Sequence, residues 1–287
     1  MRYRFIRFPG GKPKVVTLSY DDGCRADIKL SEILSKYNMK CTFNINSEYI
    51  AETDTGWYLT SKEIKEHIID KGHEIAVHGA RHRANGNIKP IEGIQDVLNC
   101  RLTLEKEFGV IVRGMAYPDS GIRHFHNNVT YSDITSYLKS LDIAYARTIS
   151  KANDSFYYPE DWYRWIPTAH HYDAEVFDLI EKFTSFKLED TFLACKLPKV
   201  FYLWGHSYEF DKRDDWGRME EICQKLGNKD DTWYATNMEI YEYVQAYHSL
   251  VFSADSKIIY NPTLKKIWFD IDDVPYSIEP GETLKID

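Results

Sequence analysis

Short apolar runs alternate with longer amphipathic runs along most of the chain. The short runs are rich in β-branched and aromatic residues, which is typical of strands, whereas apolar residues recur along the longer runs at helical spacing. Strands are predicted at 14–20, 40–46, 73–78, 112–118, 143–148 and 199–206. Helices are predicted at 26–37, 61–72 (with Ser61 as its cap), about 91–108, 131–142, 174–185, 215–227 and 237–250. This alternation predicts a parallel sheet covered by helices, and about seven strand–helix units favour a barrel-like α/β fold.

Residues 251–287 break the alternation. Their β-branched and aromatic runs are separated by Asn-Pro, Asp-Asp and Pro-Gly pairs, a pattern that predicts about three or four short antiparallel strands. A unit of this size does not fold alone and should pack on the main body as a structural cap. The predicted organisation is a main α/β domain over residues 1–250 and a small β-rich C-terminal appendage over residues 251–287.

Composition and charge exclude several classes of protein. Of the 287 residues, 43% are hydrophobic and 15% aromatic, which is enough to build a large core. The net charge of -8 argues against nucleic acid or an anionic membrane as the main partner. No stretch is apolar enough to span a bilayer, so no membrane span is expected. Residues 1–14 lack the apolar core of a secretory signal, which favours a cytoplasmic location. Nothing in the pattern indicates an oligomeric state.

The cysteines do not indicate a disulfide framework or a thiolate metal site. Their number, five, is odd, their spacing is wide, and no C-x-x-C pair occurs. We expect small, reduced and mostly buried thiols at these positions.

Polar residues gather where the predicted strands end. The first strand ends in Asp21 and Asp22, the third leads into His78 and His82, and the strong late strand ends at His206. In parallel α/β folds the carboxyl ends of the strands face a shared site. Each signal alone has an ordinary structural explanation, so the hypothesis of a shared site rests on their joint positions.

The residue types at this edge favour a metal site. His78 and His82 are four residues apart and would share one face of a helical turn. One Asp oxygen and two His nitrogens, with open positions for water, are typical of a catalytic metal, either zinc or another divalent ion. A cation bound by one carboxylate of the Asp21–Asp22 pair would also relieve the repulsion between the two.

Four segments resemble the motifs of the polysaccharide deacetylase family, also described as the nodulation-protein B homology domain. They are "LSYDDG" (18–23), "HGARH" (78–82), "AYPDSG" (116–121) and "YLWGHSYEF" (202–210), in the family's order. The resemblance implies that residues 1–250 form a distorted (β/α) barrel catalytic domain with a divalent metal, most consistent with Zn²⁺. It implies that Asp21 is the general base, that Asp22, His78 and His82 bind the metal, and that His206 is the general acid.

The resemblance is incomplete in two motifs. Tyr117 and Pro118 correspond to the third motif, which forms one wall of the groove and whose backbone helps to hold the oxyanion. The family often has an Arg where Tyr117 stands, and Arg113, Arg147 or Arg164 could replace it. The acidic partner of the catalytic histidine would be Asp161. Among the aromatic residues near the rim, Trp204 and Tyr208 would suit sugar rings, whereas His170 and His171 are either structural or substrate-contacting.

The sequence therefore predicts a metal-dependent carbohydrate deacetylase. It would hydrolyse N- or O-linked acetyl groups, with a metal-activated water as nucleophile, Asp21 accepting the proton and His206 protonating the leaving group. Two alternatives stay open: a metal-dependent hydrolase of another C–N bond, such as a cyclic amide or formyl group, and a carbohydrate-binding relative that has lost catalysis.

Overall fold

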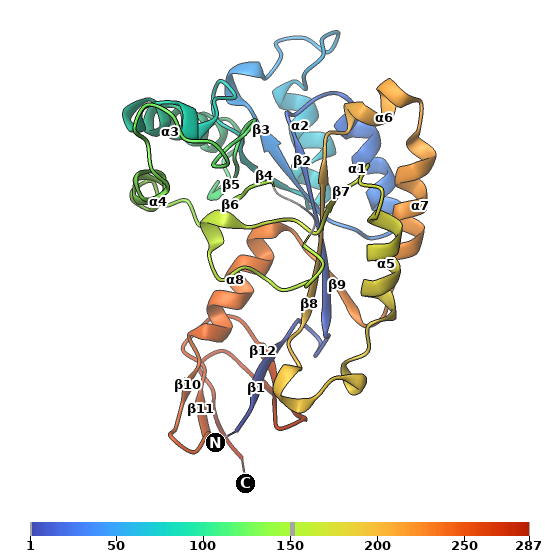
Figure 1. Ribbon diagram of the computed structural model, residues 1–287, viewed down its shortest axis with the longest axis vertical. Helices are drawn as coiled ribbons and strands as arrows, with labels where there is room; N and C mark the ends of the chain where they lie inside the picture. Colours follow the sequence, from blue (N-terminus) through green and yellow to red (C-terminus); the bar gives the residue numbers. More distant parts are fainter. Residues whose placement is uncertain (1, 150–152, 287) are drawn as a thin grey trace.

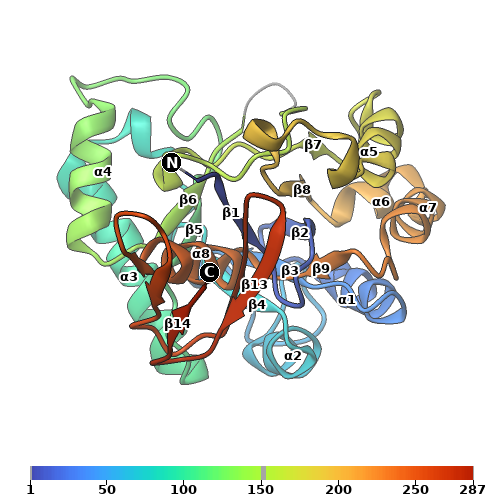
Figure 2. The same ribbon diagram turned by 90° about the horizontal axis from the view of Figure 1, so that it is seen from below.

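The computed structural model describes residues 2–149 and 153–286, and its centre is a curled sheet of seven parallel strands that forms half of a barrel (Figures 1 and 2). The predicted distorted (β/α) barrel is confirmed. Across the sheet, the strands follow the order β6 (Tyr145–Arg147), β5 (Gly114–Ala116), β4 (Glu74–Val77), β3 (Cys41–Ile45), β2 (Lys14–Asp21), β8 (Lys199–Gly205) and β7 (Ala169–His170). A further strand, β9 (Thr232–Tyr234), pairs in parallel with the first residues of β2.

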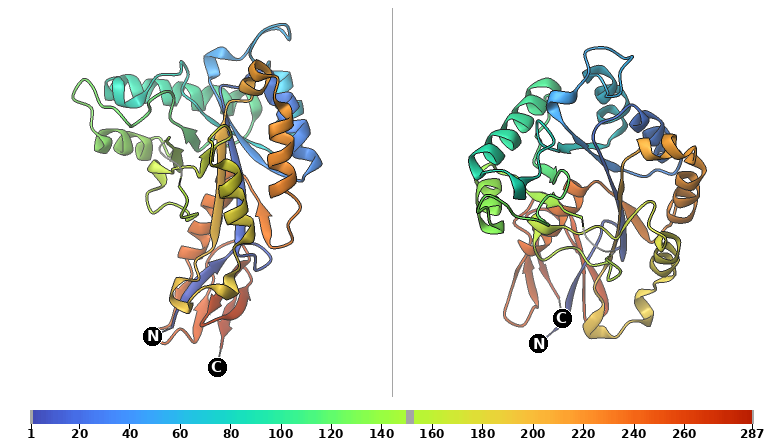
Figure 3. Two further views of the ribbon diagram at one scale, coloured as in Figure 1. Left: turned by 45° about the vertical axis from the view of Figure 1, so that its right-hand side comes forward. Right: turned by 45° about the horizontal axis from the view of Figure 1, so that its top comes forward.

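Among the described residues, seven helices form an outer arc around the sheet, and an eighth helix, α8, packs on its concave side (Figures 2 and 3). The helices are α1 (Ala26–Lys36), α2 (Ser61–His67), α3 (Pro90–Phe108), α4 (Tyr131–Ser140), α5 (Val176–Ser185), α6 (Tyr208–Arg213), α7 (Trp216–Leu226) and α8 (Asn237–His248). Short 3₁₀ turns are η1 (Ser47–Tyr49), η2 (Ile69–Lys71), η3 (Asn85–Asn87), η4 (Trp162–Arg164), η5 (Leu188–Asp190) and η6 (Leu193–Cys195). Among the described helices, no one has both the length and the apolar character needed to cross a bilayer.

The predicted helices and the long strands are confirmed, mostly with small shifts at their ends. The helix predicted at 61–72 is shorter, because α2 ends at His67 and the separate turn η2 follows it. The cap of α2 is Thr60 rather than Ser61, because the Thr60 side chain accepts a hydrogen bond from the Glu63 N–H and the Glu63 carboxylate accepts one from the Thr60 N–H. The pattern missed α6, β7 and β9. These elements are too short to show a periodic pattern of their own.

Strand β2 shows why the site forms where it does. Val16, Leu18 and Tyr20 join the large core between the sheet and the outer helices. The alternate residues face the concave side, where Val15 packs in the core shared with α8. The Thr17 hydroxyl donates to Asn237 at the start of α8, and this inward-facing row ends in Asp21. The inward face of β2 therefore presents polar side chains after Val15, and the last of them is the buried carboxylate of Asp21.

The C-terminal appendage contains the predicted antiparallel strands but also takes in the beginning of the chain. One sheet consists of β1 (Arg4–Arg7), β12 (Ile267–Ile271) and β13 (Val274–Ile278), and the other of β10 (Val251–Phe252), β11 (Ile258–Tyr260) and β14 (Thr283–Lys285). Arg7 and Asp270 form a buried ion pair within the first sheet. The first and last described strands, β1 and β14, therefore both lie at the end of the barrel away from the carboxyl end of β2 (Figures 1 and 3). The division at residue 250 stays a prediction.

The five cysteines are free thiols, and only Cys195 among them is exposed. The expectation of reduced thiols agrees with the structure.

Candidate functional site

The Asp21–Asp22 pair lies in a tight turn at the carboxyl end of β2. Asp22 has φ 80° and Gly23 has φ 65°, which are left-handed values that a non-glycine residue seldom adopts. Asp21 is buried, and Asp22 is partly exposed in the adjoining opening. Such a costly backbone conformation persists only where surrounding structure enforces it, and it is often found at functional sites.

Asp22 lies between His78 and His82, as the resemblance implied. Its Oδ1 atom is 3.6 Å from His78 Nε2 and 3.4 Å from His82 Nε2. The two histidines do not lie on a helical turn, so that part of the prediction is wrong. They follow β4 in a loop that turns through Gly79 (φ 73°) and His82 (φ 55°), and their ring centroids are 4.8 Å apart.

The hydrogen bonding of these histidines fits a bound cation. His78 Nδ1 is 2.9 Å from the Ala116 carbonyl oxygen, which only accepts, so Nδ1 carries the hydrogen and Nε2 directs a lone pair toward Asp22. Around zinc with bonds of about 2.0–2.2 Å, neighbouring ligand atoms are roughly 3.3–3.5 Å apart. The distances from Asp22 match this spacing closely. The acceptor atoms of Asp22 and His78 that face one another in this way suit a positive charge between them.

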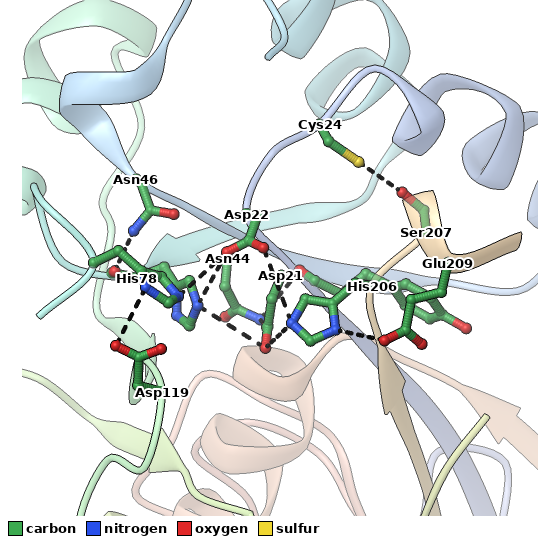
Figure 4. A network of polar contacts seen from close by, with 12 residues as sticks. Asp21, Asp22, Cys24, Asn44, Asn46, His78, Asp119, His206, Ser207 and Glu209 are labelled. Carbon is green, nitrogen blue, oxygen red and sulfur yellow. Dashed lines mark hydrogen bonds and ion pairs between the residues drawn. The ribbon is translucent and has the colours of Figure 1, made fainter. Parts of the chain in front are cut away.

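The loop that carries His78 is fixed by Asn46, which follows β3. The Asn46 amide donates to the carbonyls of His78 (2.5 Å) and Gly79 (3.2 Å) (Figure 4). Burial lowers the pKa of His78 and outweighs the opposite effect of Asp21 and Asp22, so its ring stays neutral, the form that binds metals.

Asp21 is held ionised by a buried guanidinium. Arg147 Nη2, from β6, is 2.5 Å from Asp21 Oδ2, and the Asn44 amide donates to Asp21 Oδ1 at 2.8 Å. Burial alone would raise the pKa of Asp21, but Arg147, with help from His78 and His206, lowers it to about 2. The register of the sheet explains Asn44, because β3 aligns it directly with Asp21.

Of the three arginines proposed to tune the base, only Arg147 reaches Asp21. Arg113 instead pairs with Asp142 at 2.9 Å, and the Arg164 guanidinium lies 4.1 Å from the centre of the Tyr131 ring. Arg113 and Arg164 were therefore wrong candidates for a contact with Asp21.

His206, directly after β8, faces the carboxylate pair from the other side. Its Nε2 atom is 4.0 Å from Asp21 Oδ2 and 4.0 Å from Asp22 Oδ2. Its Nδ1 atom is 3.4 Å from Glu209 Oε1, so the ring bridges Glu209 and the Asp pair (Figure 4). Burial would lower the pKa of His206, but the surrounding carboxylates raise it overall, which favours a protonated ring.

Glu209 was not predicted, and it gathers three imidazoles. Besides His206, its Oε2 atom is 3.2 Å from His170 Nε2 and 2.8 Å from His171 Nε2. The hydrogen bonds from these rings lower the pKa of Glu209 despite its partial burial. Asp161 was wrong as the acidic partner of His206, because it caps η4 and accepts from the Tyr131 hydroxyl instead. A signal for Glu209 was available, namely an acidic residue three positions after His206 at a helix start.

Of the other predicted rim residues, Tyr208 and Trp204 lie near His206, whereas Tyr117 and Pro118 make backbone contacts. Tyr208 lies 5.2 Å and Trp204 5.9 Å from His206 between ring centroids. Tyr117 is buried, with its hydroxyl donating to the Tyr163 carbonyl and its N–H donating to the Arg147 carbonyl. The Tyr117 N–H therefore already has an acceptor, so it is not free to donate to an oxyanion. Pro118, which follows, has no N–H and uses its carbonyl to accept from the Gly121 N–H.

Comparison with known proteins assigns a family to part of the chain. Residues 9–143 match the family model described as polysaccharide deacetylase. These residues belong to the polysaccharide deacetylase family. The resemblance expected from the motifs is thus confirmed, and the deacetylase-family region contains Asp21, Asp22, His78 and His82. A search of curated proteins finds no match to the chain.

Several solved structures are similar to this chain, and the first of the three that follow supports the fold. A protein from Mycobacterium smegmatis, whose assignment as a polysaccharide deacetylase is itself provisional, is 16% identical with a TM-score of 0.52, over 85% of this chain and 94% of its own. A Streptococcus pyogenes deacetylase in complex with acetate is 22% identical (TM-score 0.42), over 48% of this chain and 57% of its own. A Bacillus anthracis pseudoenzyme of carbohydrate esterase family 4 is 13% identical (TM-score 0.47), over 79% and 65%. The chain thus spans little more than half of the Streptococcus pyogenes protein.

Proposed function

We propose that this protein is a metal-dependent hydrolase that removes acetyl groups from a carbohydrate. The observation that carries the proposal is the position of Asp21: a buried, ionised carboxylate lies between a metal-type ligand group (Asp22, His78 and His82) and a histidine with a raised pKa (His206). A protein that only bound a metal or a sugar would need neither a base nor an acid here. Hydrolysis of an acyl group uses both.

Asp22, His78 and His82 would hold the cation. A divalent ion there supplies a Lewis acid for the acetyl carbonyl and lowers the pKa of water. The side chains suit zinc, and other divalent transition metals have overlapping preferences.

Asp21 would accept the proton of the attacking water. Its contacts with Arg147 and Asn44 keep it deprotonated near neutral pH and fix its orientation. The same contacts hold its side chain in one rotamer. Asp21 is not needed as a ligand in this arrangement. Asp22 would therefore bind the metal, and Asp21 would accept the proton.

His206 would protonate the departing amine or alkoxide. Glu209 faces Nδ1 of the ring while Nε2 faces the Asp pair, so a proton on Nε2 points into the site. Stabilisation of the imidazolium by Glu209 resembles the role of the acidic member in a Ser-His-Asp triad. In this proposal the acyl group would sit between Asp21 and His206.

The experiment that tests this function measures acetate release. The zinc-loaded protein is incubated with acetylated oligosaccharides, acetylated xylan, cyclic amides and formylated amines. Acetate from a carbohydrate substrate, lost after chelation and regained with zinc, supports the proposal. Turnover of only the amides or formyl compounds would favour another C–N hydrolase, and no turnover of any compound by the metal-loaded protein would contradict hydrolysis.

A further inference from the structure

His171 is a fully buried histidine that the chemistry described so far does not use. It directly follows β7, and its N–H donates to the Trp204 carbonyl of β8 at 3.0 Å. It belongs neither to the metal-type ligand group nor to the pair of Asp21 and His206. Burying an imidazole costs free energy unless its two nitrogens have partners. The partners of these nitrogens therefore indicate what the burial achieves.

The two ring nitrogens of His171 join two separate segments of the chain. Nε2 is 2.8 Å from the Glu209 carboxylate, which only accepts, so Nε2 carries the hydrogen. Burial lowers the pKa of His171 to about 4 despite the opposite effect of Glu209, so the ring is neutral and Nδ1 is an acceptor. The Tyr20 hydroxyl lies 3.1 Å from Nδ1 and donates to it, since the alternative acceptor, Met219 Sδ at 3.4 Å, is weaker.

Packing leaves the His171 ring no room to move. The ring stacks on Tyr20, with centroids 5.6 Å apart and planes 15° apart, and its centroid is 4.2 Å from that of Phe210. A Cβ atom at Gly205 would lie 2.0 Å from His171 Nδ1, so β8 can pass this close to the ring only with a glycine there. The Arg218 guanidinium donates to the His171 carbonyl at 2.7 Å and fixes the backbone as well.

The residues that enclose His171 are direct neighbours of the proposed base and the proposed acid. Tyr20 precedes Asp21 on β2, and Gly205 precedes His206 on β8. The two strands pair in parallel with Tyr20 and Gly205 in register. One buried ring therefore contacts both strands one residue before each of these side chains.

Glu209 connects His171 to His206. Its Oε2 atom accepts from His171, and its Oε1 atom is 3.4 Å from His206 Nδ1 (Figure 4). The Glu209 side chain is 22% exposed and begins on α6, a helix of six residues, so its own element restrains it weakly. His170 also contacts Oε2, at 3.2 Å, but its side chain is partly exposed. The fully buried ring of His171 is therefore the firmest anchor of this carboxylate.

We propose that His171 is a positioning residue, which holds Glu209 so that one carboxylate oxygen faces His206 and the His206 ring stays directed at Asp21. The proposal rests on the proposed deacetylase function and deepens it. It extends the pair of His206 and Glu209 into a row of four side chains that ends at Tyr20.

The test replaces His171 in the zinc-loaded protein and measures acetate release from the acetylated oligosaccharides and acetylated xylan. We expect His171→Leu to lower kcat about tenfold, with little change in KM or zinc content, because changes to residues that orient a reacting group cost about 10–100-fold. His171→Gln should restore most of the loss, since its side-chain amide can donate to Glu209. Tyr20→Phe keeps the packed ring and removes only the donor to Nδ1, so a smaller fall in kcat is expected.

His73→Leu is the matched control. His73 is also buried, its pKa is likewise lowered to about 4 by burial, and it accepts from the Cys41 N–H directly before β4, at the end of the sheet opposite Asp21. This variant should lose stability in denaturant unfolding and keep its kcat. A folded His171→Leu variant with wild-type kcat, or an equal loss of kcat in His73→Leu, would overturn the proposal. If His171→Leu does not fold, an unchanged kcat in Tyr20→Phe would overturn it instead.

Nuclear magnetic resonance of the histidine rings separates this proposal from the proposed function, because it needs no turnover. In protein labelled with ¹⁵N-histidine, the wild type and His171→Gln should show a hydrogen on His206 Nδ1 that is bonded to Glu209, and His171→Leu should lose that signal. Its loss in a protein that releases no acetate would support the positioning role and contradict the deacetylase. An unchanged signal in His171→Leu, or no such signal in the wild type, would contradict the positioning role whatever the activity.

Discussion

Two groups of histidines flank Asp21, and their imidazole rings differ in which nitrogen carries the hydrogen. In the first group, His78 gives its Nδ1 hydrogen to the Ala116 carbonyl, and the Nε2 atoms of His78 and His82 face the Asp22 carboxylate. In the second group, His170, His171 and His206 converge on Glu209. The spacing in the two groups is alike, since His170 Nε2 is 3.2 Å and His206 Nδ1 3.4 Å from the Glu209 carboxylate. By distance alone, either group could hold a metal.

The hydrogen bond on the far side of each ring separates the groups. The Tyr172 N–H donates to His170 Nδ1 at 3.1 Å, so a neutral His170 carries its hydrogen on Nε2, where it points at Glu209. A nitrogen that carries hydrogen cannot bind a metal. In the first group, His78 therefore presents a lone pair to the space beside Asp22. In the second group, His170 presents an N–H donor to the Glu209 carboxylate. The comparison teaches that ligand function depends on what the distal nitrogen contacts.

The largest effect should come from removing a ligand in the first group. We expect His78→Ala to lower zinc affinity by at least about 100-fold, since changes in the outer shell of a metal site already cost about 10–100-fold, and to abolish acetate release. His170→Ala is the matched control, because it removes an imidazole of equal spacing from the second group. Zinc content after dialysis, measured by elemental analysis, should be one ion per chain in the control.

Two results would break this comparison. A wild-type protein that retains two zinc ions per chain, with His170→Ala retaining one, would make the second group a metal site. Unchanged zinc content in His78→Ala would reject the first group as the ligand set.

The next effect concerns Asp21, the proposed base, which lies between the two groups. Asp21→Asn should lower kcat by about 10²–10⁴-fold, the range typical of general acid–base catalysis, while zinc content stays at the wild-type level. The amide keeps an oxygen that can accept from Arg147, so the fold should survive, and circular dichroism checks this. Full turnover in Asp21→Asn would show that the proton goes elsewhere.

A smaller effect is expected from the carboxylate of the second group. Glu209→Gln removes the charge that favours a protonated His206, and we expect kcat to fall by about 10–100-fold without loss of zinc. A double-mutant cycle with His206→Asn sharpens the assignment. If Glu209 acts through His206, Glu209→Gln adds no further loss once His206 is absent, and independent, additive losses would argue for a separate role.

The sequence predicted the first group far better than the second, for physical reasons. Asp22 and His78 follow strands whose apolar pattern is clear, and the rule that parallel strands end at one edge brought them together. Glu209 needs the short turn of α6 to bring it back onto His206, and His170 lies on a two-residue strand. Elements of that length have no period to detect. The tautomer of each ring depends on tertiary contacts with distant carbonyls and N–H groups, which no local pattern contains.

The contact between Arg147 and Asp21 could not be predicted from the sequence either, because the sequence contains three candidate arginines and no local pattern distinguishes them. The choice depends on the curl of the sheet, which turns β6 toward β2 across the concave side until the Arg147 guanidinium meets Asp21. Arg113 comes just before β5 on the same sheet, yet its guanidinium bonds to Asp142 after α4.

The smallest expected effect is that of Arg113→Ala, and its comparison with Arg147→Lys distinguishes the two arginines. Arg113→Ala removes only a partly exposed ion pair, so the free energy of unfolding should fall by less than about 1 kcal/mol, and kcat should not change. Arg147→Lys keeps the positive charge but loses the planar guanidinium that contacts the buried Asp21 carboxylate. We therefore expect kcat to fall in Arg147→Lys, in contrast to Arg113→Ala. Denaturant unfolding and acetate release measured on both variants test this contrast. A fall in kcat for Arg113→Ala as large as that for Arg147→Lys would mean that charge at this edge of the sheet, and not contact with Asp21, controls the base.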